Sequence, residues 1–312
     1  MNRRLPLSLR PLAWATLVAN CVLVLTGGAV RLTGSGLGCP TWPRCTEQSF
    51  RPHGALDVHE AIEFGNRMLT FVLVAIAVAT LVAACVATFR TGRLDVLILA
   101  LVLALGIPAQ AVIGGVTVLT NLNPWVVSLH LLCSLAIIGV AVLFLWRLDR
   151  PSPRRRRGAE VTLAWLTFAA GWLVLLVGTV VTGSGPHAGD IDSPRNGLNP
   201  LQVSQLHADL VFLFVGLTVG LLFAVRAAGR PATVRRAVLT LLGLELAQGT
   251  IGFVQYFTDL PVVLVGFHLL GAALVSAAAT WTLLTVRESH PGEERTTAGP
   301  HPRGQALPSS SH

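Results

Sequence analysis

Histidine is the residue type of this sequence with the clearest capacity for chemistry. His130, His207 and His268 lie within strongly apolar stretches, and His59 lies just before another. An imidazole inside a membrane is costly, so it is either hydrogen-bonded between helices or functional. Imidazole is also the usual axial ligand of haem iron, and two histidines on neighbouring helices can hold a haem. We therefore predict one haem site between His207 and His268, and a second that uses His130.

The second apolar stretch must supply the partner of His130. His59, Glu63 and Asn66 are spaced so that they share one face of a helix that begins this early. Internal alignment with the second half of the chain favours His59 as the counterpart of His207. A carboxylate at the rim of an apolar bundle is costly unless it is paired or functional. Glu63 is therefore either a catalytic residue or one member of an ion pair with Arg67, four residues on.

Two cysteines, Cys39 and Cys45, lie in the longest loop between apolar stretches. If that loop faces the oxidising side of a membrane, a disulfide between them is chemically permitted. A zinc site would need a second pair of ligands, which the loop lacks. We predict a disulfide, either a loop staple or a redox-active pair. The remaining chemistry-bearing residues receive no role: Cys21, Cys85, Cys133, His53, His187, His290, His301 and His312.

Eight apolar stretches must position these side chains. The chain of 312 residues is 53% hydrophobic and 12% charged, which excludes an ordinary soluble domain. A helix needs about 20 apolar residues to cross a bilayer. We predict an all-α integral membrane protein with transmembrane helices near residues 12–30, 66–89, 95–116, 125–146, 160–182, 205–226, 234–255 and 262–286. The first stretch lacks a small-residue cleavage site, which favours a retained helix over a signal peptide.

The arginines predict the orientation of these helices. The chain carries a formal net charge of +8 and no lysine, and eighteen of its 23 arginines lie on one side of the predicted membrane. Cytoplasmic loops are enriched in arginine. We expect both termini in the cytoplasm and the loops 31–62 and 183–204 outside. The basic charge is then a topology signal with some attraction to anionic lipid, and we expect no nucleic-acid partner.

The sequence repeats itself in its two halves. The matched elements are Gln110…His130 with Gln248…His268, and Thr33-Gly-Ser-Gly36 with Thr182-Gly-Ser-Gly185. Because each half holds four helices, the two halves enter the membrane in the same direction. We predict two parallel four-helix repeats with a pseudo-twofold axis along the membrane normal. The expected domains are an N-terminal half (1–146), an Arg-rich linker (147–159), a C-terminal half (160–286) and a disordered tail (287–312).

Three motifs together resemble the haem A synthase family over residues 12–286. They are the segment Val30-Arg-Leu-Thr-Gly-Ser-Gly-Leu-Gly-Cys39-Pro-Thr-Trp-Pro-Arg-Cys45, the segment Glu63-Phe-Gly-Asn66-Arg67, and the paired Gln…His blocks. The resemblance implies a bacterial cell-membrane oxidase that hydroxylates the C8 methyl group of haem O twice. Loss of water from the gem-diol then leaves the formyl group of haem A. It further implies a permanent haem b on His207 and His268, and haem O as substrate with His130 as one iron ligand.

One departure from the family pattern affects the substrate site. The usual Glu-x-x-His-Arg reads Glu63-Phe-Gly-Asn66-Arg67 here, and an asparagine amide is a poor iron ligand. Either His59 replaces the missing histidine, or His130 holds the substrate haem alone and leaves an open iron position. Asn66 and Arg67 belong to the substrate haem site in both cases. We expect Glu63 to stabilise positive charge at the methyl carbon or to accept the released proton.

The expected partners follow from the resemblance: haem O, membrane lipid, haem O synthase, cytochrome oxidase assembly proteins and an electron partner of unspecified kind. Two other classes of protein share part of the pattern. A dihaem b-type electron-transfer cytochrome would need the four histidines but neither Glu63 nor the cysteine loop. A transporter built from parallel repeats would have helices broken near the membrane centre, for which only Pro108 and Glu245 are candidates.

Overall fold

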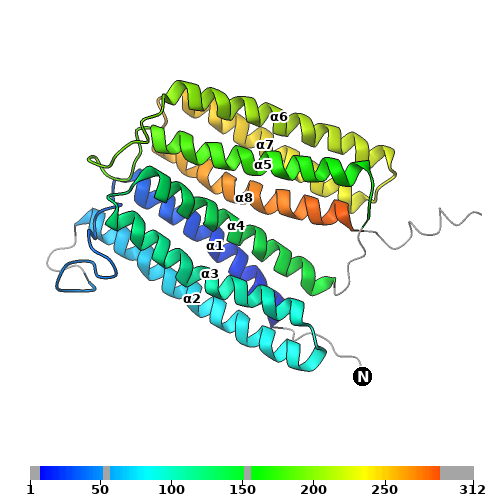
Figure 1. The fold of residues 1–312 in the computed structure, drawn as a ribbon, viewed down its shortest axis with the longest axis horizontal. Coiled ribbons are helices and arrows are strands. Elements are labelled where there is room, and N and C mark those ends of the chain that lie inside the picture. The colour runs from blue at the N-terminus through cyan, green and yellow to red at the C-terminus, as the bar shows by residue number, and fades with distance from the viewer. Residues whose placement is uncertain (1–7, 52–56, 151–155, 289–312) are drawn as a thin grey trace, which may run out of the picture.

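The computed structural model describes residues 8–51, 57–150 and 156–288, and within them the chain forms eight long helices (Figure 1). All eight are long and apolar enough to cross a membrane, which confirms an all-α, multi-pass membrane protein. The tail predicted to be disordered, beyond residue 288, and the middle of the linker lie outside the described residues. The helices are α1 (Leu9–Leu32), α2 (Val58–Thr91), α3 (Leu94–Leu119), α4 (Pro124–Asp149), α5 (Ala159–Ser184), α6 (Pro200–Ala227), α7 (Ala232–Phe257) and α8 (Val262–Arg287).

The helix α2 begins eight residues earlier than its apolar stretch. Its first two turns carry polar residues, among them His59, Glu60 and Glu63, which an apolar pattern does not detect. With 34 residues the helix is roughly 50 Å long. The hydrocarbon core of a bilayer is only about 30 Å thick. One end of α2 therefore extends well beyond the membrane core.

The helices α4 and α6 begin at the same kind of signal, an asparagine followed by a proline. The side chain of Asn123 accepts a hydrogen bond from Trp125 N at 3.0 Å, and that of Asn199 accepts one from Leu201 N at 3.0 Å. Each asparagine caps the helix, and the proline has no N–H that the first turn would leave unpaired. These caps fix His130 and His207 about two turns into their helices.

The eight helices pack in two groups of four. In the first group α1 packs against α2 and α4, and α3 packs against both α2 and α4; in the second, α5 to α8 repeat this arrangement. The two groups meet through α1, α4, α5 and α8. Figure 1 shows the two groups side by side. The domain boundaries and the direction of the repeat stay predictions. The helix α3 continues through Pro108 without a break, so the feature expected of a transporter is not present there.

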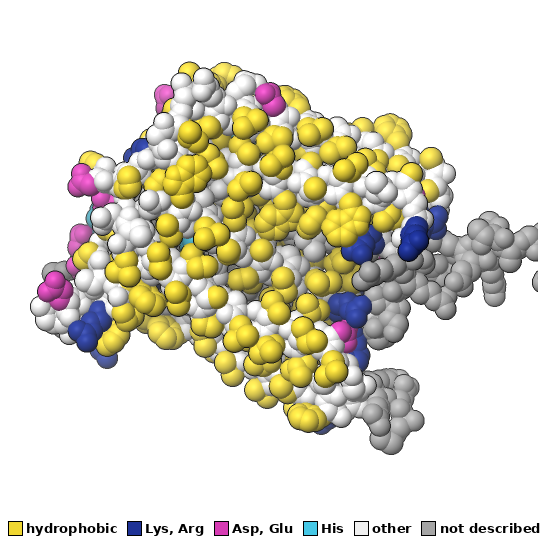
Figure 2. Space-filling view, viewed as in Figure 1, with side chains coloured by type: hydrophobic (Ala, Val, Ile, Leu, Met, Phe, Trp, Pro, Cys, Tyr) yellow, Lys and Arg dark blue, Asp and Glu magenta, His cyan; other side chains and the backbone are white. Residues whose placement is uncertain are grey.

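The outer surface of the helices is apolar along its length. Figure 2 shows hydrophobic side chains spread over the flank of the molecule, with arginine and acidic side chains gathered towards its two ends. Many large apolar side chains are exposed along the helices, including Phe71, Leu105, Phe212 and Phe253. A soluble protein rarely exposes so continuous an apolar surface. A band of this kind is suited to contact with lipid.

Arg31 joins the two groups at the end of the molecule that carries the long loops. Its guanidinium donates hydrogen bonds to the carbonyl oxygens of Thr182 at 2.9 Å and His187 at 2.6 Å. Burial, together with the positive charges of Arg31 and Arg195, lowers the pKa of the His187 ring below its usual value. The ring is therefore neutral at neutral pH, so it adds no further positive charge beside Arg31.

Candidate functional site

His207 on α6 and His268 on α8 bring their imidazole rings together inside the second group of helices. The ring centres lie 6.5 Å apart and the ring planes cross at 74°. An iron atom bound to one nitrogen of each ring by bonds of about 2 Å would place the centres roughly 6 Å apart. The Nδ1 atoms of both rings are buried without a hydrogen-bond partner in the described part of the chain. The ring of His207 also lies near the backbone of Val174 on α5, whereas for His268 no structural hydrogen bond among the described residues explains its position.

A glycine on the preceding helix makes room for each buried histidine ring. A Cβ atom at Gly178 would lie 3.1 Å from His207, and one at Gly114 would lie 3.2 Å from His130. The same contact occurs between Gly252 and His268, where the distance would be 3.6 Å. Sequence reasoning missed this role, although Gly114 and Gly252 lie at matched positions of the repeated Gln…His blocks. These cradles and the unpaired Nδ1 atoms fit a group that is held by imidazole.

His130 on α4 lies inside the first group of helices, and its ring has no histidine partner there. Its Nδ1 atom is buried without a hydrogen-bond partner among the described residues. Gln110 on α3 donates a hydrogen bond to the carbonyl oxygen of His130 at 3.0 Å, which joins α3 to α4 beside the ring. Trp42, from the cysteine loop, packs against Gly115, the residue that follows the glycine beside His130. The cysteine loop therefore covers the end of α3 next to this histidine.

His59 and Asn66 lie at different depths. His59 is exposed in the first turn of α2, and its Nδ1 lies 3.0 Å from the hydroxyl of Ser35, which follows the end of α1. Asn66 is partly buried, and its side-chain oxygen accepts a hydrogen bond at 2.8 Å from Thr26 within α1. Unlike Asn66, His59 faces an open cavity of about 550 Å³, which it lines together with Asp57, Glu60 and Asp190. The helix pair α1–α2 thus brings Asn66, and not His59, into the bundle.

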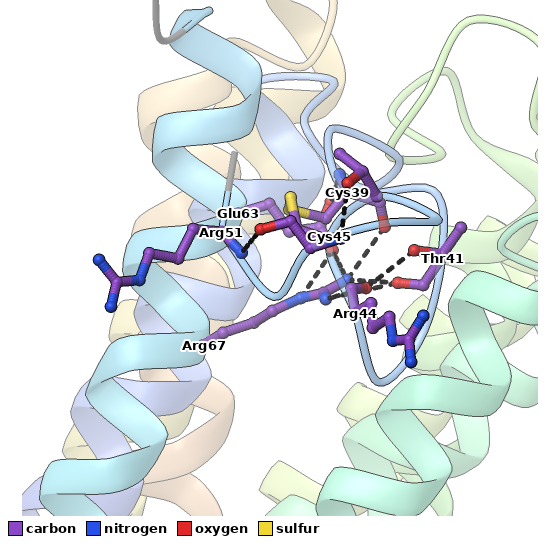
Figure 3. Close-up of a disulfide and its surroundings, with 9 residues drawn as sticks. Cys39, Thr41, Arg44, Cys45, Arg51, Glu63 and Arg67 are labelled. Carbon is purple, nitrogen blue, oxygen red and sulfur yellow. Dashed lines mark hydrogen bonds and ion pairs between the residues drawn. A yellow bond between two sulfur atoms is a disulfide. The ribbon is translucent and has the colours of Figure 1, made fainter. Parts of the chain in front are cut away.

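Glu63 is buried and uses both oxygen atoms of its carboxylate. Oε2 accepts a hydrogen bond from the backbone N–H of Cys39 at 2.6 Å, and Oε1 accepts from Nε of Arg67 at 3.1 Å. The guanidinium of Arg67 also donates to carbonyl oxygens of the cysteine loop, at Cys39 (3.0 Å), Arg44 (3.1 Å) and Thr41 (3.4 Å). Figure 3 shows Arg67 reaching from α2 under this loop. The ion pair considered from the sequence is present, and it attaches the loop to α2.

The predicted disulfide between Cys39 and Cys45 is present. Both cysteines are 0% exposed, so an external thiol has no access to the sulfur atoms in this conformation. Among the described residues no group of three or more histidine, cysteine or acidic side chains could hold a metal ion. The pair therefore closes a loop, as a staple would, and the zinc alternative has no support.

Comparison with known proteins assigns the first half of this arrangement to a family. The model of the COX15-CtaA family, described as a cytochrome oxidase assembly protein, matches residues 10–189. That is more than half of the chain. This protein belongs to the COX15-CtaA family of cytochrome oxidase assembly proteins.

Individual relatives carry a more specific name. A protein named Heme A synthase from Geobacillus thermodenitrificans is 30% identical over 154 residues, which are 48% of this chain and 47% of that protein. A protein of the same name from Listeria welshimeri is 31% identical over 146 residues, 44% of this chain and 46% of its own length. The chain thus spans about half the length of these relatives.

The COX15-CtaA match divides the candidate residues into two sets. Cys39, Cys45, Glu63, Arg67 and His130 lie inside the matched segment, as do His59 and Asn66. His207 and His268 lie beyond residue 189, so the family model does not reach them. The case for these two histidines depends on their geometry and on the internal repeat.

Proposed function

We propose that this protein is a haem A synthase, which converts haem O into haem A during cytochrome oxidase assembly. The observation that carries the proposal is the pair of imidazoles of His207 and His268, which are partly buried in the second group of helices with ring centres 6.5 Å apart. That pair lies in a chain of the COX15-CtaA family whose other half contains, among its described residues, a single partly buried histidine, His130. One half is then suited to a permanent haem and the other to a haem that must react.

In the C-terminal half, His207 and His268 would hold a haem b by its iron. The bound haem would supply one-electron transfer, which no side chain of this chain can perform. Gly178 and Gly252 leave room for the two rings, and the apolar core beneath them, which includes Phe214 and Leu241, excludes water. The protein's contribution here is to fix the ligands and the surroundings.

In the N-terminal half, His130 would bind the iron of haem O on one side. In the family motif a histidine usually stands at the position of Asn66 and would be the second iron ligand. The amide oxygen of Asn66 already accepts the hydrogen bond from Thr26. His59 is exposed and lies beyond the end of α1, which favours the alternative in which His130 is the single protein ligand. The other side of the iron then stays open for an oxidant.

Glu63 is the candidate catalytic residue for the methyl group of haem O. Each hydroxylation replaces one C–H hydrogen of the methyl group by a hydroxyl group, and the gem-diol loses one water to leave the formyl group. A fixed carboxylate could stabilise positive charge at this carbon or accept the proton that leaves it. The hydrogen bonds from Cys39 and Arg67 hold the carboxylate of Glu63 in a single position, which either role requires. Arg67 is then a positioning residue.

The alternative of a dihaem electron-transfer cytochrome receives less support from the same geometry. It requires a second histidine opposite His130, and the structure places His59 at the surface instead. We further propose that the protein lies in the bacterial cell membrane with both termini in the cytoplasm. Haem O synthase and other cytochrome oxidase assembly proteins are then its expected partners, alongside an electron partner and the surrounding lipid.

Substitution of Glu63 tests the proposed reaction. In cells that make haem O, Glu63→Gln should lower the haem A yield about 100-fold or more, because removal of a general acid–base group has an effect of that size. The spectrum of six-coordinate haem b should persist. Glu60→Gln is the matched control, since Glu60 lies on the same helix and its side chain forms no hydrogen bond with the described part of the cysteine loop. A normal haem A yield in the Glu63→Gln protein would refute the catalytic role.

A further inference from the structure

Glu245 is an acidic residue that the proposed reaction does not use. It lies in α7 and is 3% exposed. Its Oε1 lies 2.7 Å from the hydroxyl oxygen of Thr218 on α6. Its Oε2 is buried and has no hydrogen-bond partner in the part of the chain that the structure describes. A charged carboxylate is costly in such surroundings unless a cation is near.

No cation of the neighbouring helices compensates Glu245. The helix α7 packs against α6 and α8. Their titratable and charged side chains, with those of α7 itself, are His207, Asp209, Arg226, His268, Arg287, Arg235, Arg236 and Tyr256. Among the described residues Glu245 bonds to none of them. Arg235 is ten residues away along α7, roughly 15 Å, and Arg226 lies two turns beyond Thr218, so Glu245 lies between the charged ends of the helices.

The contact with Thr218 suits both protonation states of Glu245. The Thr218 hydroxyl lies within hydrogen-bond distance of Glu245 and also 3.0 Å from the carbonyl oxygen of Phe214. A hydroxyl has one proton to donate. It can be donated to an ionised Glu245; alternatively a protonated Glu245 donates to Thr218, and Thr218 donates to Phe214. The carboxyl group can therefore gain or lose a proton without any movement of the helices.

The bundle does not need a carboxyl group at this position in order to pack. Glu245 precedes Gln248 by three residues, and in the matching motif Ile107 precedes Gln110 by three. Ile107 is buried in the core of the first group of helices. A hydrocarbon side chain thus fills the equivalent position in the half without the histidine pair. The acidic group occurs only in the half that contains His207 and His268.

Glu245 lies close enough to the histidine pair to respond to its charge. Gly252, which packs against the ring of His268, is seven residues from Glu245 along α7, roughly 10 Å. On α6, Phe214 lies between His207 and Thr218 along the helix, one turn before Thr218, and its ring packs against Gly171. At about 10 Å and an effective dielectric constant of about 20, one unit of charge changes a proton affinity by roughly tenfold.

We propose that Glu245 is a proton-binding site that takes up one proton from water when a haem held by His207 and His268 gains one electron. This inference rests on the haem site proposed above. Reduction removes one positive charge from the haem, and the proton restores one on the carboxyl group, so the net charge of the bundle interior does not change. In the experiment an electrode supplies the electron and the buffer supplies the proton.

The midpoint potential of the haem in the purified full-length protein tests this proposal. As the pH is raised, the wild-type potential should fall by about 59 mV in total, which is the tenfold change in proton affinity converted for one electron. In Glu245→Gln this fall should be lost. Glu160→Gln is the matched control, because Glu160 is a second buried glutamate of the same half but is paired with Arg156. It should keep the wild-type pH dependence.

Two further measurements keep the proposal falsifiable if Glu245→Gln does not fold. Thr218→Val retains the carboxyl group and removes the hydroxyl that can stabilise its charge, so the fall in potential should move to higher pH. Infrared difference spectra of reduced minus oxidised wild-type protein should show a new band of a protonated carboxylic acid that shifts in D₂O. An unchanged pH dependence in both variants, with six-coordinate haem bound, would overturn the proposal. A wild-type protein without six-coordinate haem would refute the proposed haem site instead.

Discussion

At the residue scale, the partly buried histidines of α4, α6 and α8 share one local arrangement. Each lies about two turns into its helix, and each ring packs against a glycine of the helix before it. The cradle explains why small residues are needed at those points of otherwise bulky apolar helices. It also predicts that the glycines are as important for haem binding as the histidines they face.

Gly178→Val tests the cradle in the C-terminal half. A Cβ at this position would lie 3.1 Å from the ring of His207, and the two methyl groups of valine extend further. We expect most of the six-coordinate haem spectrum to be lost, because the ring must move from the ligating position. Gly216→Val on α6 is the control, since nothing lies within 4 Å of a Cβ there. Equal haem content in the two variants would show that the cradle has no role.

At the element scale, the cysteine loop is held by hydrogen bonds to α2 as well as by its own contacts. Arg67 donates to three carbonyl oxygens of the loop, and Glu63 accepts the N–H of Cys39. The loop in turn places Trp42 against α3 beside His130. The first three turns of α2 therefore hold a loop that covers the end of α3 beside His130.

Arg67→Gln should open this loop and make the disulfide accessible. Hydrogen bonds to charged groups contribute about 1.5–3 kcal/mol each, so the loss of even one predicts reduction about tenfold faster or more. The rate is measured by labelling of the Cys39 and Cys45 thiols after addition of a reductant. Arg44→Gln is the control, because Arg44 is in the same loop and, among the described residues, its guanidinium donates a hydrogen bond to the carbonyl oxygen of Glu47 and lies over the ring of Phe50 but does not reach α2. If Arg67→Gln and wild type reduce at the same rate, the clamp does not protect the disulfide.

The sequence predicted where the eight helices lie better than it predicted the residues at which they begin. The apolar stretches located all eight helices, but the polar first turns of α2 and the segment Pro200–Ser204 of α6 were missed. The Asn199–Pro200 cap was a readable signal for α6. The disulfide and the approach of His207 to His268 followed from spacing and from the repeat. The depth of His59 and the hydrogen bonds of Arg67 to the cysteine loop could not be predicted, since they depend on where the loop crosses α2.

At the scale of the whole molecule, the two groups of helices differ in the polar residues that they bury. Among the described residues, the first group has one partly buried histidine and the clamped Glu63, whereas the second has a histidine pair and the buried Glu245. The groups meet along α1, α4, α5 and α8, and Ser276 of α8 donates to the carbonyl oxygen of Leu135 on α4 at 2.8 Å. This division supports a reacting haem in one half and an electron-transferring haem in the other.

The pigment bound to the purified protein is the most direct test of this account. Protein from cells that make haem O is extracted, and the haems are separated by chromatography. We predict haem B together with haem O or haem A, with haem A rising as turnover proceeds. Two equivalents of haem B, without haem O or haem A, would contradict the proposed function and favour an electron-transfer cytochrome.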